Sequence, residues 1–418
     1  MVKAVHPNKT VQKKKSNTGK TDRYSRTARP KTRKLAVKQQ KKRGVFSGLF
    51  FSDRKAGDMD YTFLLLVGVL AVFGLIMLLS ASTPTADVKF GDSYHFFIRQ
   101  FGYVAAGTFF MLIISRIDYR KFKPYAKPFM LICMALLALV FVPHIGVSHN
   151  GSRRWINLGV TEIQPSEFTK FAISMFFASL IEDRKYDLQK FDGMVRMGLW
   201  MGIVAILMML ETHLSGTIVL CGIALCIMIA GGANLKYIFG GGIAAAGAAA
   251  IFLQFNAVRM SRITSFLNPF ADKQASGYQT IQSLYAIGSG GIFGKGLGQS
   301  VQKFSYLPEP YNDFIFSIVC EELGLVGAAF IIFLFIGLIL RGIKIASAAP
   351  DTFGSLMVVG IIAQIAIQTI LNIAVVTSSI PNTGVPLPFF SYGGTALMIL
   401  LMEMGVVLSV SRYSGKFG

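Results

Sequence analysis

Long apolar runs recur along this 418-residue chain, and each is close to the roughly 20 residues that a helix needs to cross the hydrocarbon core of a bilayer. Hydrophobic residues make up 53% of the chain and charged residues only 15%, a balance that excludes a soluble domain of this size. We therefore predict an all-α polytopic membrane protein with about ten transmembrane helices. The runs lie at about 61–80, 97–115, 128–143, 164–182, 195–211, 214–231, 236–255, 313–340, 353–377 and 390–411.

The first 57 residues differ from the rest of the chain, because they carry 18 Lys and Arg against only Asp22 and Asp53. With few large apolar residues, residues 1–57 are predicted to be a disordered cytoplasmic tail before a transmembrane domain at 58–418. Such a run is one signature of nucleic-acid binding. A polybasic stretch directly before a span more often rests on anionic headgroups, and no basic patch interleaved with aromatics follows. We therefore expect no nucleic-acid partner.

Charge also predicts the orientation of the spans. Cytoplasmic loops of membrane proteins are enriched in Lys and Arg, and an even number of spans returns the C-terminus to the side of the N-terminus. Both termini are therefore predicted to be cytoplasmic. The cations that fit this orientation are Arg116, Arg120, Lys121, Lys123, Lys127, Arg184, Lys185, Lys190, Arg341, Lys344, Arg412 and Lys416.

The predicted orientation places a large loop, residues 256–312, outside the cell between the seventh and eighth helices. Its glycines and its apolar and aromatic residues favour a folded lid, with an amphipathic interfacial helix at 278–287. Six cations break the charge rule by falling on the outer side: Arg153, Arg154, Arg259, Arg262, Lys295 and Lys303. Such cations are candidates for holding a lipid phosphate or pyrophosphate, and contact with ordinary phospholipid headgroups is the alternative.

Asp313 stands where the long loop meets the eighth span. One interpretation is a helix cap supplied by Asn312 or Asp313. The other is a general base, because Glu309 and Asp313 would both face the outer leaflet beside a glycine-rich lid. Deeper in the same helix, Glu321 or Glu322 is expected to pair with a cation such as Lys170.

Two further outer segments are predicted to line a site. The loop before the fourth span places two guanidinium groups beside an indole, and the loop near 380–394 has a density of proline and glycine that membranes tolerate only around a cavity. Trp155 has an alternative role as an interfacial anchor. The candidate substrate-binding residues are Arg153, Arg154, Trp155, Gln164, Ser166, Glu167, Lys170, Lys295, Lys303, Glu309 and Ser391.

From about residue 60 to the C-terminus the chain resembles the SEDS family of cell-wall proteins (shape, elongation, division and sporulation), in particular its FtsW and SpoVE branch. The strings that carry the resemblance are NGSRRWINLG, QPSEF, SGYQTIQSLYAIGSGGIFGKGLGQSVQKFSYLPEPYNDFIF, EELG and GVPLPFFSYGG. One stretch departs from the family: ETHLSGT at 211–217 stands where many relatives have a run like PDLGT. Any role of that Asp is therefore left out of the predicted catalytic set.

The resemblance implies a peptidoglycan glycosyltransferase of the bacterial cytoplasmic membrane. It would join Lipid II units outside the membrane and work with a class B penicillin-binding protein and with division or sporulation proteins. The family's essential acidic residue maps onto Asp313, and its Arg-Trp loop maps onto Arg153, Arg154 and Trp155.

In the family's reaction an α-linked donor becomes a β-linked product, so a single inverting displacement with one base is implied. We expect Asp313 to deprotonate the attacking hydroxyl while Arg153, Arg154, Lys295 or Lys303 holds the pyrophosphate. No cofactor is indicated with certainty, and a divalent cation (magnesium or manganese) on Asp313 and Glu309 has no spacing signature. The rival hypotheses are a transporter that flips Lipid II and a scaffold that only recruits division enzymes.

Overall fold

The fold was analysed in a computed structural model, which describes residues 56–143, 145–149, 152–157, 159, 162–211, 213–254, 266 and 276–414. Most of the predicted basic tail, and Arg259 and Arg262 of the predicted outer loop, lie outside the described residues.

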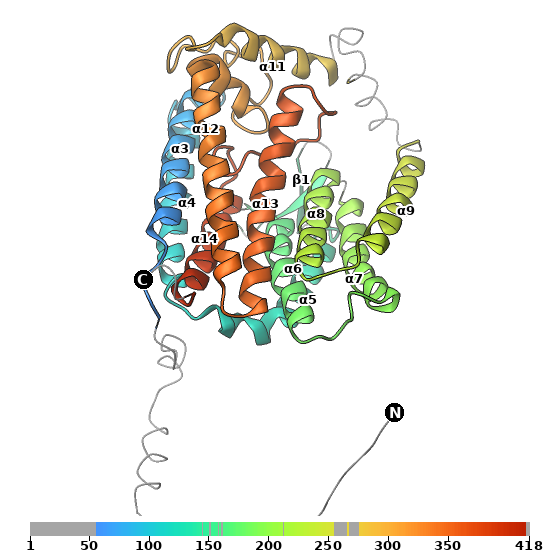
Figure 1. Ribbon diagram of the computed structural model, residues 1–418. Helices are drawn as coiled ribbons and strands as arrows, with labels where there is room; N and C mark the ends of the chain where they lie inside the picture. Colours follow the sequence, from blue (N-terminus) through green and yellow to red (C-terminus); the bar gives the residue numbers. More distant parts are fainter. Residues whose placement is uncertain are drawn as a thin grey trace, which may run out of the picture. The chain divides into compact units, whose positions relative to one another are not determined.

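The ten apolar runs are all helical, so the predicted all-α polytopic membrane protein is confirmed (Figure 1). Over the described residues the helices of the bundle are α3 (Tyr61–Phe90), α4 (His95–Ile114), α5 (Ala126–Leu139), α6 (Pro165–Glu182), α7 (Phe191–Leu210), α8 (Leu214–Ala230), α9 (Leu235–Gln254), α12 (Ile315–Ala348), α13 (Thr352–Val376) and α14 (Thr395–Arg412). A 3₁₀ helix, η2 (Tyr119–Tyr125), leads into α5. The helix predicted at 278–287 is present as α11 (Ser276–Gly290).

By length and apolarity alone, seven helices in the described part of the chain qualify as membrane spans. Helix α8 is apolar but shorter, with 17 residues. Helix α6 has 18 residues, and three of them, Glu167, Lys170 and Glu182, are charged. Because ionisable groups are costly in lipid, those on α6 are expected to face protein or a cavity rather than the bilayer.

Local capping explains several helix boundaries. Asp60 accepts a hydrogen bond from the Phe63 amide at the start of α3, and Asp351 accepts one from the Gly354 amide at the start of α13. Pro165 occupies the first turn of α6, where its missing N–H costs no helical hydrogen bond.

Helix α14 begins at Thr395, later than the predicted 390, because the preceding residues have irregular backbone.

Polar contacts gather where α14 ends, which is the end that was predicted to be cytoplasmic. Arg341 pairs with Asp60 at 2.7 Å, and Arg120 pairs with Asp351 at 2.6 Å. Helix α11 caps the opposite end of the bundle (Figure 1). The predicted cytoplasmic loops therefore share one end, whereas which end faces the cytosol stays a prediction.

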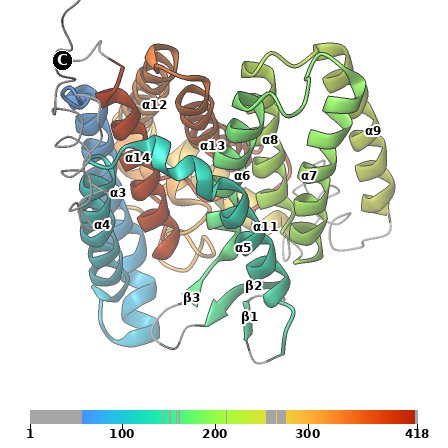
Figure 2. The ribbon, with the colours of Figure 1, turned by 90° about the horizontal axis from the view of Figure 1, so that it is seen from below.

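The loop between α5 and α6 forms a small antiparallel sheet, which the all-α prediction did not include (Figure 2). Its strands are β1 (Gly146–His149), β2 (Ser152–Asn157) and β3 (Glu162–Ile163), in that order. The short β3 leads almost directly into α6, so the sheet fixes the position of β2 next to the start of that helix.

Helix α12 is interrupted at Gly324, whose φ of 67° and ψ of −167° are not helical. Residues 291–296 run alongside the interruption and supply hydrogen bonds to it. Leu325 N–H donates to the Gly291 carbonyl at 3.0 Å, and Lys295 N–H donates to the Glu321 carbonyl at 3.0 Å. A Cβ on Gly324 would lie 2.3 Å from the Gly294 nitrogen, so only glycine fits there. This part of the predicted lid therefore lies against α12 and is part of the bundle.

The centre of the bundle is α13, which packs against α12, α8 and α6, while α14 packs against α4. Each of these helices carries apolar side chains from the buried core, and α13 also carries the fully buried Asn372. A polar side chain at such a position needs hydrogen-bond partners, because water does not reach it.

Candidate functional site

A cavity of about 1310 Å³ lies within the bundle. Its walls come from α4, β2, α6, α8, α13, α14 and the two irregular segments 309–313 and 383–394. Eight of the candidate residues line it together: Arg154, Trp155, Gln164, Glu167, Lys170, Glu309, Asp313 and Ser391. Residues separated by up to 237 positions in the sequence thus meet at one place, which is the arrangement expected of a binding site.

Asp313 lies directly before α12, with its carboxylate close to Gly384. A Cβ on Gly384 would lie 3.0 Å from Oδ2 of Asp313, and Gly384 has a φ of +68°. Glycine at 384 therefore suits both the backbone conformation and the close approach of the carboxylate. The N-cap of α12 is Phe314, which makes no side-chain capping hydrogen bond, so neither Asn312 nor Asp313 occupies the N-cap position.

The segment that carries Asp313 is held against the last irregular segment by hydrogen bonds. Ser391 donates its hydroxyl to the Asn312 carbonyl at 2.7 Å and accepts the Leu387 amide at 2.8 Å. Tyr392 N–H donates to the Tyr311 carbonyl at 2.9 Å. Ser391 therefore has a structural use for its hydroxyl as well as a place on the cavity wall.

Glu309 and Tyr311 stand on the same segment as Asp313. Glu309 has a φ of 47° and accepts a hydrogen bond from the Asn312 side chain at 3.0 Å. Burial raises the pKa of Tyr311 to about 12, and the charge of Glu309 adds to this shift. The phenol of Tyr311 is thus neutral at physiological pH, and it can donate a hydrogen bond on this wall.

An ion pair on α6 forms another part of the wall. Lys170 lies 2.7 Å from Glu167, one helical turn away, and the lysine is almost completely buried. The prediction that Glu321 or Glu322 pairs with a cation is confirmed, but the cations are Lys295 and Lys303 and not Lys170. Just before the helix, Gln164 contacts His213 at 3.3 Å, which brings the connection between α7 and α8 into the cavity wall. Ser166 is fully buried behind the cavity lining.

Strand β2 separates the two adjacent arginines. Arg154 and Trp155 line the cavity, whereas Arg153 is exposed and does not. The register of β2 is irregular at this point: Trp155 pairs with Val147 and Arg153 pairs with Ser148, so Arg154 is an extra residue between them, as in a β-bulge. A bulge re-aims side chains, which is consistent with Arg154 and Trp155 both lining the cavity. Of the two arginines that the sequence suggested would act jointly, only Arg154 therefore lines the cavity.

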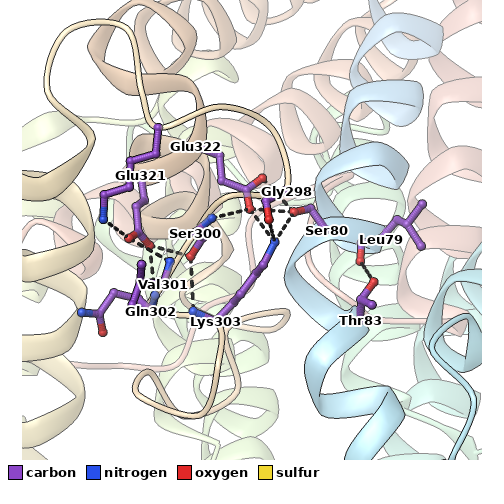
Figure 3. A network of polar contacts seen from close by, with 11 residues as sticks. Leu79, Ser80, Thr83, Gly298, Ser300, Val301, Gln302, Lys303, Glu321 and Glu322 are labelled. Atoms are coloured by element: carbon purple, nitrogen blue, oxygen red, sulfur yellow. Dashed lines mark hydrogen bonds and ion pairs between the residues drawn. The ribbon is translucent and has the colours of Figure 1, made fainter.

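Lys295 and Lys303 take part in a separate network on α12, shown in Figure 3. Lys295 lies 2.6 Å from Glu321, and Lys303 lies 2.9 Å from Glu322. Ser80 of α3 donates its hydroxyl to Glu322 at 2.7 Å. Neither lysine lines the cavity. Their ammonium groups neutralise the buried carboxylates of Glu321 and Glu322. We therefore do not include these two lysines in the proposed substrate site.

Several residues of the cavity wall were missed by the sequence analysis, among them Arg99 and Tyr103 of α4 and Gln364 and Gln368 of α13. Arg99 had a detectable signal, because a cation stood at the outer end of the second apolar run. The two glutamines recur four residues apart on α13, a spacing that puts them on one helix face.

Comparisons with known proteins agree with this architecture. Residues 60–416 match the family described as "Cell cycle protein", which comprises FtsW, RodA and SpoVE. Stage V sporulation protein E of Bacillus subtilis is 45% identical over 86% of this chain and 99% of its own length. A protein of Geobacter sp. named "Probable peptidoglycan glycosyltransferase FtsW" is 38% identical over 86% of this chain and 98% of its own length.

Two solved structures share the fold. One, described as "Structural coordination of polymerization and crosslinking by a peptidoglycan synthase complex", has a TM-score of 0.72 and 26% identity, over 86% of this chain and 99% of the matched one. Thermus thermophilus rod shape determining protein RodA has a TM-score of 0.64 and 25% identity, over 85% of this chain and 98% of its own. The chain belongs to the FtsW, RodA and SpoVE family of polytopic membrane proteins, as its motifs indicated.

Proposed function

We propose that this chain is a peptidoglycan glycosyltransferase that polymerises Lipid II, with Asp313 as the catalytic base. The observation that carries the proposal is the meeting of Asp313 with Arg154 and Lys170 on one cavity. A carboxylate near cations is what transfer of a sugar from a lipid pyrophosphate requires. The relatives named as peptidoglycan glycosyltransferases support the same class of reaction.

The proposed step is a single displacement. A hydroxyl oxygen of one sugar forms a bond to the anomeric carbon of the donor, while the bond from that carbon to the pyrophosphate oxygen breaks. The hydroxyl proton passes to the carboxylate of Asp313, and the electron pair of the broken bond leaves with the pyrophosphate. Attack from the side opposite the leaving group inverts the anomeric centre, so one base suffices.

The cations of the cavity have a separate role in this mechanism. Arg154 offers a planar fork of N–H donors that matches phosphate oxygens, and the partly neutralised Lys170 adds positive charge deeper in the cavity. Fixed cations stabilise the developing negative charge of the leaving group more strongly where water is excluded. Glu167 is proposed to keep Lys170 in place through the 2.7 Å ion pair.

The metal dependence of the reaction stays a prediction. Among the described residues, no group of three or more His, Cys, Asp or Glu is arranged to hold a metal ion. Glu309 and Asp313 both line the cavity, and Mg²⁺ is often held by one or two carboxylates together with substrate phosphate and water. These two residues would hold magnesium or manganese, which would supply positive charge to the pyrophosphate.

The site is proposed to face the outside of the bacterial cytoplasmic membrane, with both termini in the cytoplasm. Support comes from the cations of the predicted cytoplasmic loops, which lie at the end of the bundle opposite α11. A class B penicillin-binding protein is the proposed partner, because the similar solved structure is described as a complex that couples polymerisation to crosslinking. Division or sporulation proteins are proposed as further partners.

Purified protein supplied with Lipid II in detergent tests the proposal. The native chain, alone or with its penicillin-binding partner, is expected to make glycan polymer, and Asp313→Ala is expected to make none. A transporter that only flips Lipid II would give no polymer in either case. A scaffold would still support growth of cells that carry Asp313→Asn. Native activity in purified Asp313→Ala would refute the role of Asp313 as base.

A further inference from the structure

Asn372 is a buried amide on α13 that contacts both segments around the candidate base. Its Nδ2 donates to the Asp313 carbonyl at 2.7 Å and to the Val385 carbonyl at 2.8 Å. The side chain is fully buried, and its two donated hydrogen bonds are short and have no water to replace them. One side chain thus ties the backbone of residue 313 to the backbone of residue 385.

These two hydrogen bonds hold the backbone beside the contact between Gly384 and the Asp313 carboxylate. Val385 follows Gly384, the residue whose open α-carbon face lies against Oδ2 of Asp313. When Asn372 holds both carbonyls, the backbone of Asp313 and the backbone of Gly384 keep a fixed position relative to each other. Helix α13 is the central helix of the bundle, so the anchor point itself is rigid.

Other contacts brace the same two segments. Beside Asp313, Ser391 donates to the Asn312 carbonyl and Tyr392 N–H donates to the Tyr311 carbonyl, and a further set lies at α11. Gln279 of α11 donates to the Pro308 carbonyl at 3.3 Å and accepts from the Asn382 side chain at 3.0 Å. The Gln279 bonds are exposed or partly buried, whereas the Asn372 side chain is fully buried and its bond to the Val385 carbonyl is buried as well. Loss of Asn372 would therefore shift the base while the segments stay attached to α11.

We propose that Asn372 is a positioning residue that sets the position and orientation of the Asp313 carboxylate in the cavity. The inference rests on the proposed function, because the position of Asp313 matters only if Asp313 takes a proton. Asn372 itself does not line the cavity, so its effect must pass through Asp313. A displacement of about 1 Å at a reacting group can reduce a rate about 100-fold.

The first test uses Asn372→Asp and Asn372→Leu in the full-length purified chain. Both variants keep the approximate size of the side chain and remove the two N–H donors. We expect the turnover of Lipid II to fall by about 100-fold, with little change in KM and a shifted pH–rate profile. The matched control is Thr369→Val, one turn earlier on α13, where the buried hydroxyl has no hydrogen-bond partner in the described part of the chain. It should keep the native rate.

A second test does not depend on polymerisation. Asp313→Cys is labelled in intact membranes with an impermeant maleimide, and the native chain gives the background of its four cysteines. Adding Asn372→Leu is expected to change the labelling rate several-fold, and adding Thr369→Val is expected to leave it unchanged.

The outcomes separate the two proposals. If the native chain makes no polymer, the proposed function fails, and the labelling rates still decide whether Asn372 positions residue 313. If the native chain makes polymer and both Asn372 variants match its rate, the positioning role is wrong. Failure of both variants to fold, with the Thr369→Val control intact, would also overturn it, because Asn372 would then be required for the fold.

Discussion

The start of α12 carries two kinds of carboxylate in very different surroundings. Glu321 and Glu322 are completely buried, and each has an ammonium group and a hydroxyl as partners. Asp313, only eight residues before Glu321, is partly exposed and lines a large cavity. All three are acidic groups near the same end of one helix, yet of the three only Asp313 lines the cavity.

This difference shows that burial of a charge does not by itself indicate catalysis. An ionisable group inside a membrane protein is a reasonable functional candidate, but a carboxylate whose oxygens are all engaged by fixed donors is a structural element. Access to a cavity is the better criterion. By this criterion Lys295 and Lys303 belong with the structural group, and Arg154 and Lys170 belong with the site.

The largest effect is expected from removing the charge of Asp313. Asp313→Asn keeps the shape of the side chain but cannot take a proton, so the initial polymerisation rate should fall by about 10²- to 10⁴-fold. The midpoint of thermal unfolding should stay close to the native value, because the side chain is partly exposed. If Asp313→Asn lost stability together with activity, Asp313 would have a structural role like that of Glu321 and Glu322.

The reverse pattern is expected for the Glu322 ion pair. Lys303→Met leaves the buried carboxylate of Glu322 without its cation, which typically costs about 3–5 kcal/mol of stability. Thermal unfolding in detergent should show a clear loss, and the double variant Lys303→Met with Glu322→Gln should recover much of it. If the single variant had normal stability and a specific rise in KM for Lipid II, Lys303 would be a substrate-binding residue, as the sequence analysis suggested.

A smaller effect is expected from the two arginines of β2. Arg154→Ala should raise KM for Lipid II by about 10- to 100-fold, the range for losing a charge-assisted hydrogen bond, whereas Arg153→Ala should change it little. Because the residues are adjacent in the sequence, each serves as the control for the other. Equal effects of the two substitutions would show that access to the cavity does not separate their roles.

Much of the fold could be predicted from the apolar runs, because the length of a bilayer-spanning helix is fixed by the thickness of the membrane. The small sheet could not be predicted in the same way. Its strands are two to six residues long, too short for a clear period-two pattern. The separation of Arg153 from Arg154 was missed for this reason.

The grouping of Asp313 with the Arg154 and Lys170 regions was anticipated from loop position and charge. A cation was predicted to pair with Glu321 or Glu322, but Lys295 and Lys303 were not identified as the cations, because their positions depend on the interruption of α12 at Gly324. Nothing local in the sequence says that residues 291–296 return to lie beside that interruption. Asn372 was missed although it continues the four-residue spacing of Gln364 and Gln368 along α13, a pattern that could have placed all three amides on one helix face.

The interruption of α12 also has a consequence for the biogenesis of this protein. Residues 291–296 leave the ribosome before Gly324, yet the backbone groups around Gly324 find their partners only when the earlier segment folds back onto them. Inserted alone, this helix would expose unpaired amides and carbonyls to lipid. The upper part of α12 and residues 291–296 are therefore expected to reach their final structure together, as one unit, during insertion into the membrane.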